Sequence, residues 1–154
     1  MRGGRVMLVG LDGCGKSTLA DVVEGAPSDH RHREDCYYRD LTLEVPGRYV
    51  ENHWMHNIVI MLAQNQASAL CLLVDAATLE TYYSSGFAKA TTVPSVGLLT
   101  KCDQVSEEAR ERGLAALLDA GVGEAWCLST ATGEGLERFS EWAASVASSA
   151  SHAS

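Results

Sequence analysis

Apolar and polar residues follow one another along this chain in blocks that alternate between strand-like and helix-like periods. Continuous apolar runs, typical of buried strands in a parallel sheet, cover residues 5–9, 69–74, 94–100 and 125–128, with a shorter run at 41–44. Apolar residues at helical spacing predict helices at residues 16–24, 49–63, 106–120 and 134–147. The alternation predicts an α/β fold of three layers, in which helices cover both faces of a mostly parallel sheet. Ligand loops are then expected at the carboxyl ends of the strands.

Three segments do not follow either period. Residues 28–40 are polar and charged, which predicts a loop with at most a short edge strand. Residues 78–90 are expected to be helical or irregular, because the run S-S-G at 84–86 interrupts them. Residues 148–154 are rich in serine and alanine and are expected to form a disordered tail. We therefore expect one domain, at residues 1–147.

Composition excludes several classes of partner. The 154 residues are 46% hydrophobic and 21% charged, as in soluble globular proteins, and carry a net charge of −8. An acidic balance disfavours nucleic acid and anionic membranes as partners. The longest apolar stretches are too short to span a bilayer, and no signal peptide is expected before the first strand. The five cysteines form no C-x-x-C pair, so we expect reduced thiols and a cytoplasmic protein.

The most specific motif lies between the first strand and the first helix. Residues 10–18 read G-L-D-G-C-G-K-S-T and match the phosphate-binding loop pattern G-x-x-x-x-G-K-[ST] in its strand–loop–helix context. Glycines let successive backbone N–H groups converge on an anion, and the helix N-terminus adds partial positive charge. The predicted phosphate-binding residues of this loop are Gly10, Asp12, Gly13, Cys14, Gly15, Lys16, Ser17 and Thr18.

Two side chains of this loop carry the expected chemistry. Lys16 supplies a cation for the β- and γ-phosphates and is the predicted catalytic residue, while the Ser17 hydroxyl is a predicted ligand of Mg²⁺. Cys14 lies at the helix N-terminus, where a thiolate would be stabilised. The motif therefore predicts a nucleoside triphosphate, bound with Mg²⁺.

Two later loops are candidates for reading the base. The T-K-C-D run at 100–103 places a carboxylate where it can accept two hydrogen bonds from guanine, a donor pair that adenine does not offer. The S-T-A run at 129–131 can bring a backbone N–H to the base carbonyl. The predicted base-binding residues are Thr100, Lys101, Asp103, Ser129, Thr130 and Ala131. GTP is therefore the favoured ligand, and ATP is the second candidate.

These motifs carry a resemblance to known families. T-K-C-D resembles the [NT]-K-x-D motif of small Ras-like GTPases. Nearly the whole chain, except residues 28–40 and the tail, resembles the EutP/PduV family of ethanolamine- and propanediol-utilisation proteins. The run E-V-P-G-R-Y-V-E-N at 44–52 resembles that family's D-T-P-G-E-Y-x-E-N, and further matches lie at 73–76, 86–88, 93–101 and 129–135.

The resemblance implies more than the motifs do by themselves. It implies a Ras-like P-loop NTPase fold, with Glu44 as a metal residue beside Ser17 and with Gly47 as a further phosphate-binding residue. It also implies association with a bacterial microcompartment, whose shell or enzyme proteins would be the partners.

The metal and switch positions depart from the family pattern. The family has Asp where this chain has Glu44, and the added methylene predicts weakened rather than abolished Mg²⁺ binding. The place of the usual switch threonine holds Arg33, and Thr42 is too near the strand that ends in Glu44. Arg31, Arg33 or Arg39 can act as a cation on the γ-phosphate, or the segment is a solvated basic loop.

The position that usually orients the attacking water also departs from the pattern. Arg48 follows Gly47 where GTPases usually carry Gln, so hydrolysis is expected to be slow. His53 and His56 are expected to be partly exposed helix histidines. Two other functions stay open: a kinase-like phosphotransferase acting on a small acceptor, with residues 28–40 as its lid, and a nucleotide-dependent docking module that does not hydrolyse.

Overall fold

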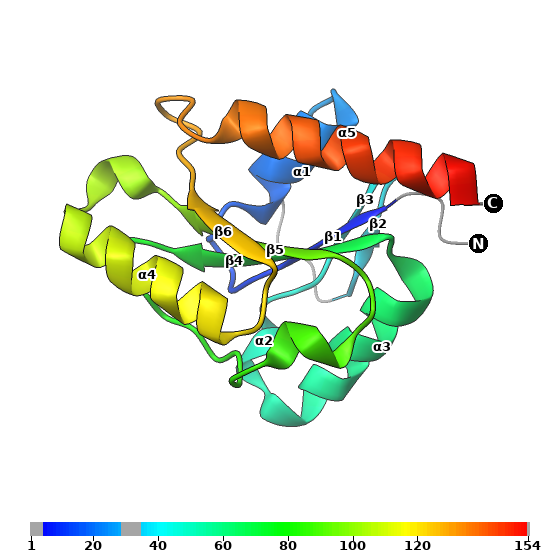
Figure 1. Ribbon diagram of the computed structural model, residues 1–154, viewed down its shortest axis with the longest axis horizontal. Helices are drawn as coiled ribbons and strands as arrows, with labels where there is room; N and C mark the ends of the chain where they lie inside the picture. Colours follow the sequence, from blue (N-terminus) through cyan, green and yellow to red (C-terminus); the bar gives the residue numbers. More distant parts are fainter. Residues whose placement is uncertain (1–4, 29–34, 154) are drawn as a thin grey trace.

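A six-stranded sheet forms the centre of the molecule (Figure 1). The computed structural model describes residues 5–28 and 35–153. The strands are β1 (Val6–Val9), β2 (Tyr37–Tyr38), β3 (Thr42–Glu44), β4 (Ala69–Asp75), β5 (Ser95–Thr100) and β6 (Glu124–Cys127). They lie in the order β2-β3-β1-β4-β5-β6, and the pairs are parallel except for the antiparallel pair of β2 and β3. The mostly parallel α/β sheet predicted from the sequence is therefore confirmed.

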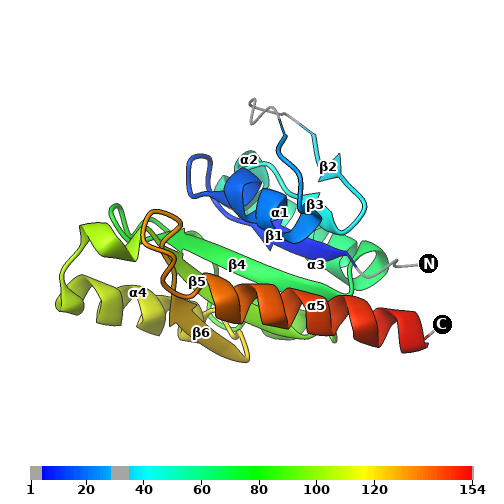
Figure 2. The ribbon, with the colours of Figure 1, turned by 90° about the horizontal axis from the view of Figure 1, so that it is seen from above.

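Helices cover both faces of this sheet, which gives the three expected layers (Figure 1). One face carries α1 (Lys16–Glu24) and α5 (Leu136–Ala153), and Figure 2 looks onto this face. The other carries α2 (Arg48–Glu51), α3 (His56–Gln66) and α4 (Glu107–Asp119). Alternate residues of β1 serve the two layers: Leu8 lies in the core cluster of Phe139, and Met7 in that of Leu117. Both faces are apolar, so the strands read as continuous hydrophobic runs.

Local sequence explains the helix boundaries. α1 ends at Gly25, which has a φ of 72°, the left-handed conformation that glycine adopts most easily. Before α4, the Ser106 hydroxyl accepts a hydrogen bond from the Ala109 N–H at 3.3 Å, so Ser106 is the N-cap of the helix that the sequence predicted from residue 106.

The helix predicted at 49–63 is divided into three pieces. Between α2 and α3 lies a 3₁₀ turn, η1 (His53–Met55), because Asn52 takes an extended conformation with φ −96° and ψ 106°. The Arg48 carbonyl accepts from both the backbone N–H and the side-chain amide of Asn52, at 3.1 and 2.8 Å, so Asn52 closes the last turn of α2. The expected continuous helix was therefore wrong, and the side chain that ends α2 is visible only in three dimensions.

The carboxyl end of the chain also differs from expectation. The last helix, α5, continues to Ala153, beyond the end expected at residue 147, and the predicted disorder of residues 148–154 stays a prediction. Alanine has the highest helix propensity, and no proline or glycine interrupts this segment. Serine and alanine here extend a helix that has already been nucleated by its packed first turns.

The segment between β4 and β5 is irregular and contains only the short 3₁₀ helix η2 (Phe87–Ala90). Phe87 is buried there, and the Tyr83 hydroxyl lies 3.1 Å from both the Val9 and Leu73 carbonyls. Val9 ends β1, immediately before the loop that holds the phosphate motif, and Leu73 lies in the neighbouring strand β4. Through Tyr83, the segment between β4 and β5 therefore stabilises the backbone that leads into the phosphate loop.

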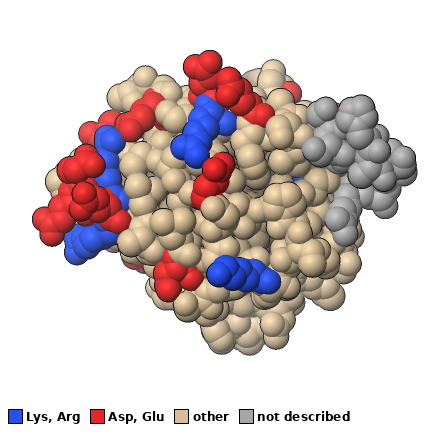
Figure 3. Space-filling view, in the orientation of Figure 1, with Lys and Arg blue, Asp and Glu red and all other residues tan. Residues whose placement is uncertain are grey.

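The surface view agrees with the polar character of the outer helix faces. Figure 3 shows acidic and basic side chains close together at the side of the molecule where α4 lies. Exposed residues of α4 include Glu107, Glu108, Glu111 and Arg112. Among the described residues, no helix combines the length and apolar character needed to cross a membrane.

Candidate nucleotide-binding site

A cavity of about 460 Å³ lies at the carboxyl ends of the parallel strands. Ligand sites of open α/β sheets are expected at this edge. The predicted site residues that line it are Asp12, Gly13, Cys14, Gly15, Lys16, Ser17, Thr18, Glu44, Thr100, Lys101 and Thr130. Residues that come from four separate places in the sequence therefore meet in one cavity.

The phosphate-binding loop has the backbone geometry that its glycines predict. Gly13 and Gly15 have φ values of 82° and 106°, which side-chain-bearing residues rarely adopt. Gly10 is needed for a different reason, because a Cβ there would lie 2.6 Å from the Cys14 sulfur. α1 begins at Lys16, so the positive end of the helix faces the cavity.

The Lys16 side chain folds back onto the backbone of the phosphate loop. Its ammonium donates to the Gly10 carbonyl at 2.6 Å and to the Leu11 carbonyl at 3.1 Å, and the residue is only 9% exposed. These contacts fix a positive charge at the wall of the cavity, where a phosphate oxygen can share it.

Ser17 and Glu44 meet although 27 residues separate them. The Ser17 hydroxyl donates to Glu44 Oε1 at 2.7 Å, so the longer side chain of Glu still reaches this position. Glu44 is 7% exposed, and its Oε2 has no hydrogen-bond partner among the residues that the structure describes. A buried carboxylate oxygen without a partner is costly, and a hard cation is the kind of group that satisfies it.

Gly47 lies against the loop rather than on the wall of the cavity. Its N–H donates to Asp12 Oδ1 at 3.2 Å. The predicted phosphate-binding role of Gly47 therefore stays a prediction, and its N–H faces a carboxylate of the phosphate loop in this structure.

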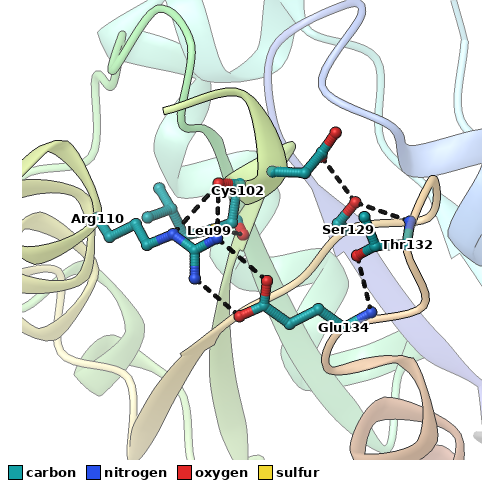
Figure 4. Close-up of polar contacts among 7 residues, drawn as sticks. Leu99, Cys102, Arg110, Ser129, Thr132 and Glu134 are labelled. Atoms are coloured by element: carbon teal, nitrogen blue, oxygen red, sulfur yellow. Dashed lines mark hydrogen bonds and ion pairs between the residues drawn. The ribbon is translucent and has the colours of Figure 1, made fainter. Parts of the chain in front are cut away.

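The two candidate base-reading loops are joined at Asp103, whose Oδ1 accepts from the buried Ser129 hydroxyl at 2.7 Å. The same hydroxyl accepts from the Thr132 N–H at 3.2 Å (Figure 4). Asp103 itself is exposed, as a carboxylate that receives a base must be. Asp103, Ser129 and Ala131 do not line the cavity, so their predicted roles stay predictions.

Arg110 anchors the Asp103 loop from α4. Its guanidinium donates to the Cys102 carbonyl at 2.8 and 3.2 Å and pairs with the Glu134 carboxylate at 2.8 and 3.2 Å (Figure 4). Cys102 lies in the 3₁₀ turn η3 (Cys102–Gln104), and Glu134 follows the S-T-A run. One side chain thus holds both base-reading loops.

Thr100 and Lys101 connect the base-reading side to the phosphate loop. The Thr100 hydroxyl lies 2.8 Å from the Cys14 carbonyl, so it supports the loop instead of facing a base. The Lys101 ammonium donates to the Gly13 carbonyl and to Asp75 Oδ2, both at 2.8 Å. Lys101 lines the cavity, and its predicted role of packing its aliphatic stem against a base stays a prediction.

The expected reactive thiolate at Cys14 was wrong. Its side chain is 2% exposed and lies in the core beneath the loop, and burial raises the pKa of the thiol. Desolvation outweighs the stabilising effect of nearby Lys16. The backbone of Cys14 is used within the protein, since its N–H donates to the Leu11 carbonyl at 3.2 Å and its carbonyl accepts from Thr100, so the predicted phosphate-binding role of Cys14 stays a prediction.

The structure differs from the expectations for Arg39, a candidate cation for the γ-phosphate, and for His56, expected to be partly exposed. Arg39 does not serve as a cation in the cavity, because its guanidinium pairs with Asp21 at 2.8 Å and donates to the Ala26 carbonyl at 2.8 Å. His56 is buried instead of partly exposed, with Nε2 lying 2.6 Å from the Val50 carbonyl. Arg31 and Arg33 lie outside the described residues. Thr42 is buried and donates to Glu24, which agrees with its exclusion from the site.

Sequence reasoning missed several residues of the site. Asp35 and Tyr37 line the cavity from the segment expected to be a loop, and Asp75 holds Lys101. Asp75 ends β4, so the rule that ligand loops follow strand ends could have found it. For Arg110, no local pattern marks the residue, because its partners lie 8 and 24 positions away.

Solved structures with the same fold define the class of this protein. The chain aligns with a bacterial selenocysteine-specific elongation factor, EF-Sec, at a TM-score of 0.64 and 23% identity, over 97% of this chain and 29% of that one. It aligns with a probable GTP-binding protein, engB, at a TM-score of 0.62 and 14% identity, over 94% of this chain and 99% of that one. The chain has the Ras-like P-loop NTPase fold, and it spans less than a third of the elongation factor.

Sequence comparison then defines the family. Residues 3–144 match the family PduV-EutP, described as "Ethanolamine utilisation - propanediol utilisation". The chain is also 26% identical over 135 residues to the propanediol utilization protein PduV of Citrobacter freundii, which covers 88% of this chain and 89% of that protein. The chain belongs to the PduV-EutP family, and the resemblance found in the sequence is confirmed.

Proposed function

We propose that this protein binds a guanine nucleoside triphosphate with Mg²⁺ and hydrolyses it slowly. The observation that carries the proposal is that the phosphate loop, with Lys16 on the cavity wall, is tied by hydrogen bonds from Thr100 and Lys101 to the segment that carries Asp103. The Asp103 carboxylate is in turn oriented by the Ser129 hydroxyl. A carboxylate at this place accepts from the two adjacent donors of guanine, whereas adenine would leave it without a matching pair.

Mg²⁺ would be held by Ser17 and Glu44. The partnerless, buried Oε2 of Glu44 fits a hard cation, and the Ser17 hydroxyl lies beside it. The metal would neutralise charge on the β- and γ-phosphates. The residues of this chain hold the phosphates in place through the loop N–H groups and Lys16.

Slow turnover follows from Arg48. An arginine side chain has only donors, so it can neither accept a proton from the attacking water nor orient it through an acceptor. The Arg48 guanidinium lies 4.8 Å from the centre of the Tyr49 ring, in a cation–π contact that holds it along α2. An activating partner would have to supply the missing acceptor.

A place in a bacterial microcompartment for ethanolamine or propanediol utilisation is the cellular setting we propose. Membership of the PduV-EutP family supports it, together with the name of the Citrobacter freundii relative. Its partners would then be shell or enzyme proteins of that assembly. Co-sedimentation of the tagged protein with purified microcompartments, with and without nucleotide, is the direct measurement.

Nucleotide titration of the stripped protein tests the proposal. Fluorescent GTP and ATP analogues are added with Mg²⁺ to the wild type and to Asp103→Ala, and single-turnover hydrolysis is followed in the wild type and Lys16→Ala. We expect GTP to bind more tightly than ATP, and Asp103→Ala to weaken GTP binding about a hundredfold, as loss of two hydrogen bonds to a charged group implies. If ATP binds as tightly as GTP, and Asp103→Ala leaves the affinity for both analogues unchanged, guanine recognition is rejected and a kinase-like phosphotransferase is favoured.

A further inference from the structure

The contact between Asp12 and Gly47 joins two segments that are both assigned to the phosphates. The Gly47 N–H donates to Asp12 Oδ1 at 3.2 Å, across 35 positions of sequence. A Cβ at Gly47 would lie 2.7 Å from that oxygen and 2.6 Å from the Asp12 backbone nitrogen. The φ of Gly47 is −58°, which any residue can adopt. Glycine is therefore needed here because the two segments approach so closely.

A terminal phosphate would compete with Asp12 for this N–H. Under the proposed function, the loop N–H groups, the end of α1 and Lys16 would hold the α- and β-phosphates, and Gly47 is not among the residues that line that cavity. A third phosphate placed at Gly47 would meet a carboxylate that already accepts from its donor. Two anions cannot share one N–H at close range without strong repulsion, since the cavity wall screens them less than bulk water does.

We infer that Asp12 makes this site discriminate between nucleoside diphosphates and triphosphates. Its carboxylate holds the position on the Gly47 N–H that a terminal phosphate would take, so a triphosphate binds only by displacing it, and a diphosphate binds without doing so. This inference rests on the nucleotide-binding function proposed above. Displacement of Asp12 also releases the start of α2 from the phosphate loop, because Gly47 immediately precedes that helix.

Binding of two guanine nucleotides to four proteins tests the inference. GDP and a non-hydrolysable GTP analogue are titrated, with Mg²⁺, against the stripped wild type, Asp12→Ala, Asp12→Asn and Glu80→Gln. Asp12→Ala removes the charge and the acceptor, while Asp12→Asn keeps an acceptor oxygen without the charge. Glu80 lines a smaller cavity of about 150 Å³ together with Asp12, so Glu80→Gln controls for the loss of a negative charge nearby.

We expect the wild type to bind GDP more tightly than the triphosphate analogue. Asp12→Ala should shift the ratio of the two dissociation constants about tenfold toward the triphosphate, Asp12→Asn by less, and Glu80→Gln by less than about twofold. Hydrogen exchange at the Gly47 amide, measured without nucleotide, should be faster in Asp12→Ala than in the wild type.

The outcomes separate this inference from the proposed function. Unchanged ratios in Asp12→Ala, or an equal shift in Glu80→Gln, overturn the role of Asp12 while nucleotide binding stands. A wild type that binds neither nucleotide overturns the proposed function, and the inference with it.

Discussion

At the scale of single residues, Glu44 departs most informatively from the pattern of its family. Its Oε1 is occupied by the Ser17 hydroxyl, while Oε2 is buried without a partner among the described residues. The shorter Asp of the family pattern is therefore not required for a carboxylate to reach Ser17. The local backbone at the end of β3 places the longer side chain in the cavity wall.

Glu44→Gln tests whether that oxygen serves a metal. The substitution removes the charge that attracts a divalent cation, so the Mg²⁺ concentration that half-saturates nucleotide binding should rise about tenfold. The measurement is a Mg²⁺ titration at fixed fluorescent GTP analogue. Glu51→Gln, on the exposed end of α2, is the control and should leave the Mg²⁺ requirement unchanged. Equal Mg²⁺ requirements in the wild type and Glu44→Gln would argue against a metal role.

At the scale of elements, α4 acts on the base-reading side of the site through one side chain. Arg110 is the only residue drawn in Figure 4 that comes from this helix, and it reaches both η3 and the loop after β6. An exposed ion pair alone contributes little to stability. Its bonds to the Cys102 carbonyl, however, fix the turn that carries Asp103.

Arg110→Ala should therefore weaken nucleotide binding more than it weakens the fold. We expect the dissociation constant for the GTP analogue to rise about three- to tenfold, because the Asp103 turn loses its anchor. Arg112→Ala is the matched control, since Arg112 is an exposed arginine on the same helix. Fluorescence titration and urea unfolding of both variants provide the comparison. If the two variants lose the same amount of affinity, the effect comes from general charge and not from the anchor.

The elements also show how far sequence reasoning reaches. Boundaries fixed by local chemistry, such as Ser106 before α4 and Gly25 after α1, were predicted correctly. The division of α2 from α3 was not, because it depends on an Asn52 conformation that helical periodicity does not report. Likewise, the residues proposed to bind the base were selected from their motif. Arg110 could not be selected in this way, since its contacts exist only with partners brought near by folding.

At the scale of the whole molecule, buried thiols make stability depend on alkaline pH. Burial raises the pKa of Cys102 from 9.0 to about 12, and it also raises the pKa values of Cys14, Cys71 and Tyr83. The unfolded chain therefore releases these protons at lower pH than the folded chain does. Because the folded state then binds more protons, its stability is fully present below the ordinary pKa of each group and falls as the pH rises toward the raised value.

Urea unfolding across this range checks the sign. The free energy of unfolding should fall between pH 9.0 and about 12, the interval set by Cys102. Cys102→Ser keeps a donor for the Leu99 carbonyl but does not titrate there, so its slope should be smaller by up to about 1.4 kcal/mol per pH unit. Near neutral pH the thiol is protonated in both the folded and the unfolded state. The difference in free energy of unfolding between wild type and Cys102→Ser measured there therefore reports only the change in packing. Identical slopes for the two proteins would contradict the assignment.

The sequence by itself determined the alternation of strands and helices, the phosphate loop, the base-reading motif and the family. Each of these depends on local periodicity or on a short run of residues that are neighbours in the sequence. Tertiary structure decided which distant residues meet: Ser17 with Glu44, Asp12 with Gly47, and Arg110 with Cys102 and Glu134. Parallel strands bring their carboxyl ends to one edge of the sheet, and the contacts made there depend on sheet order and side-chain reach, which no local pattern encodes.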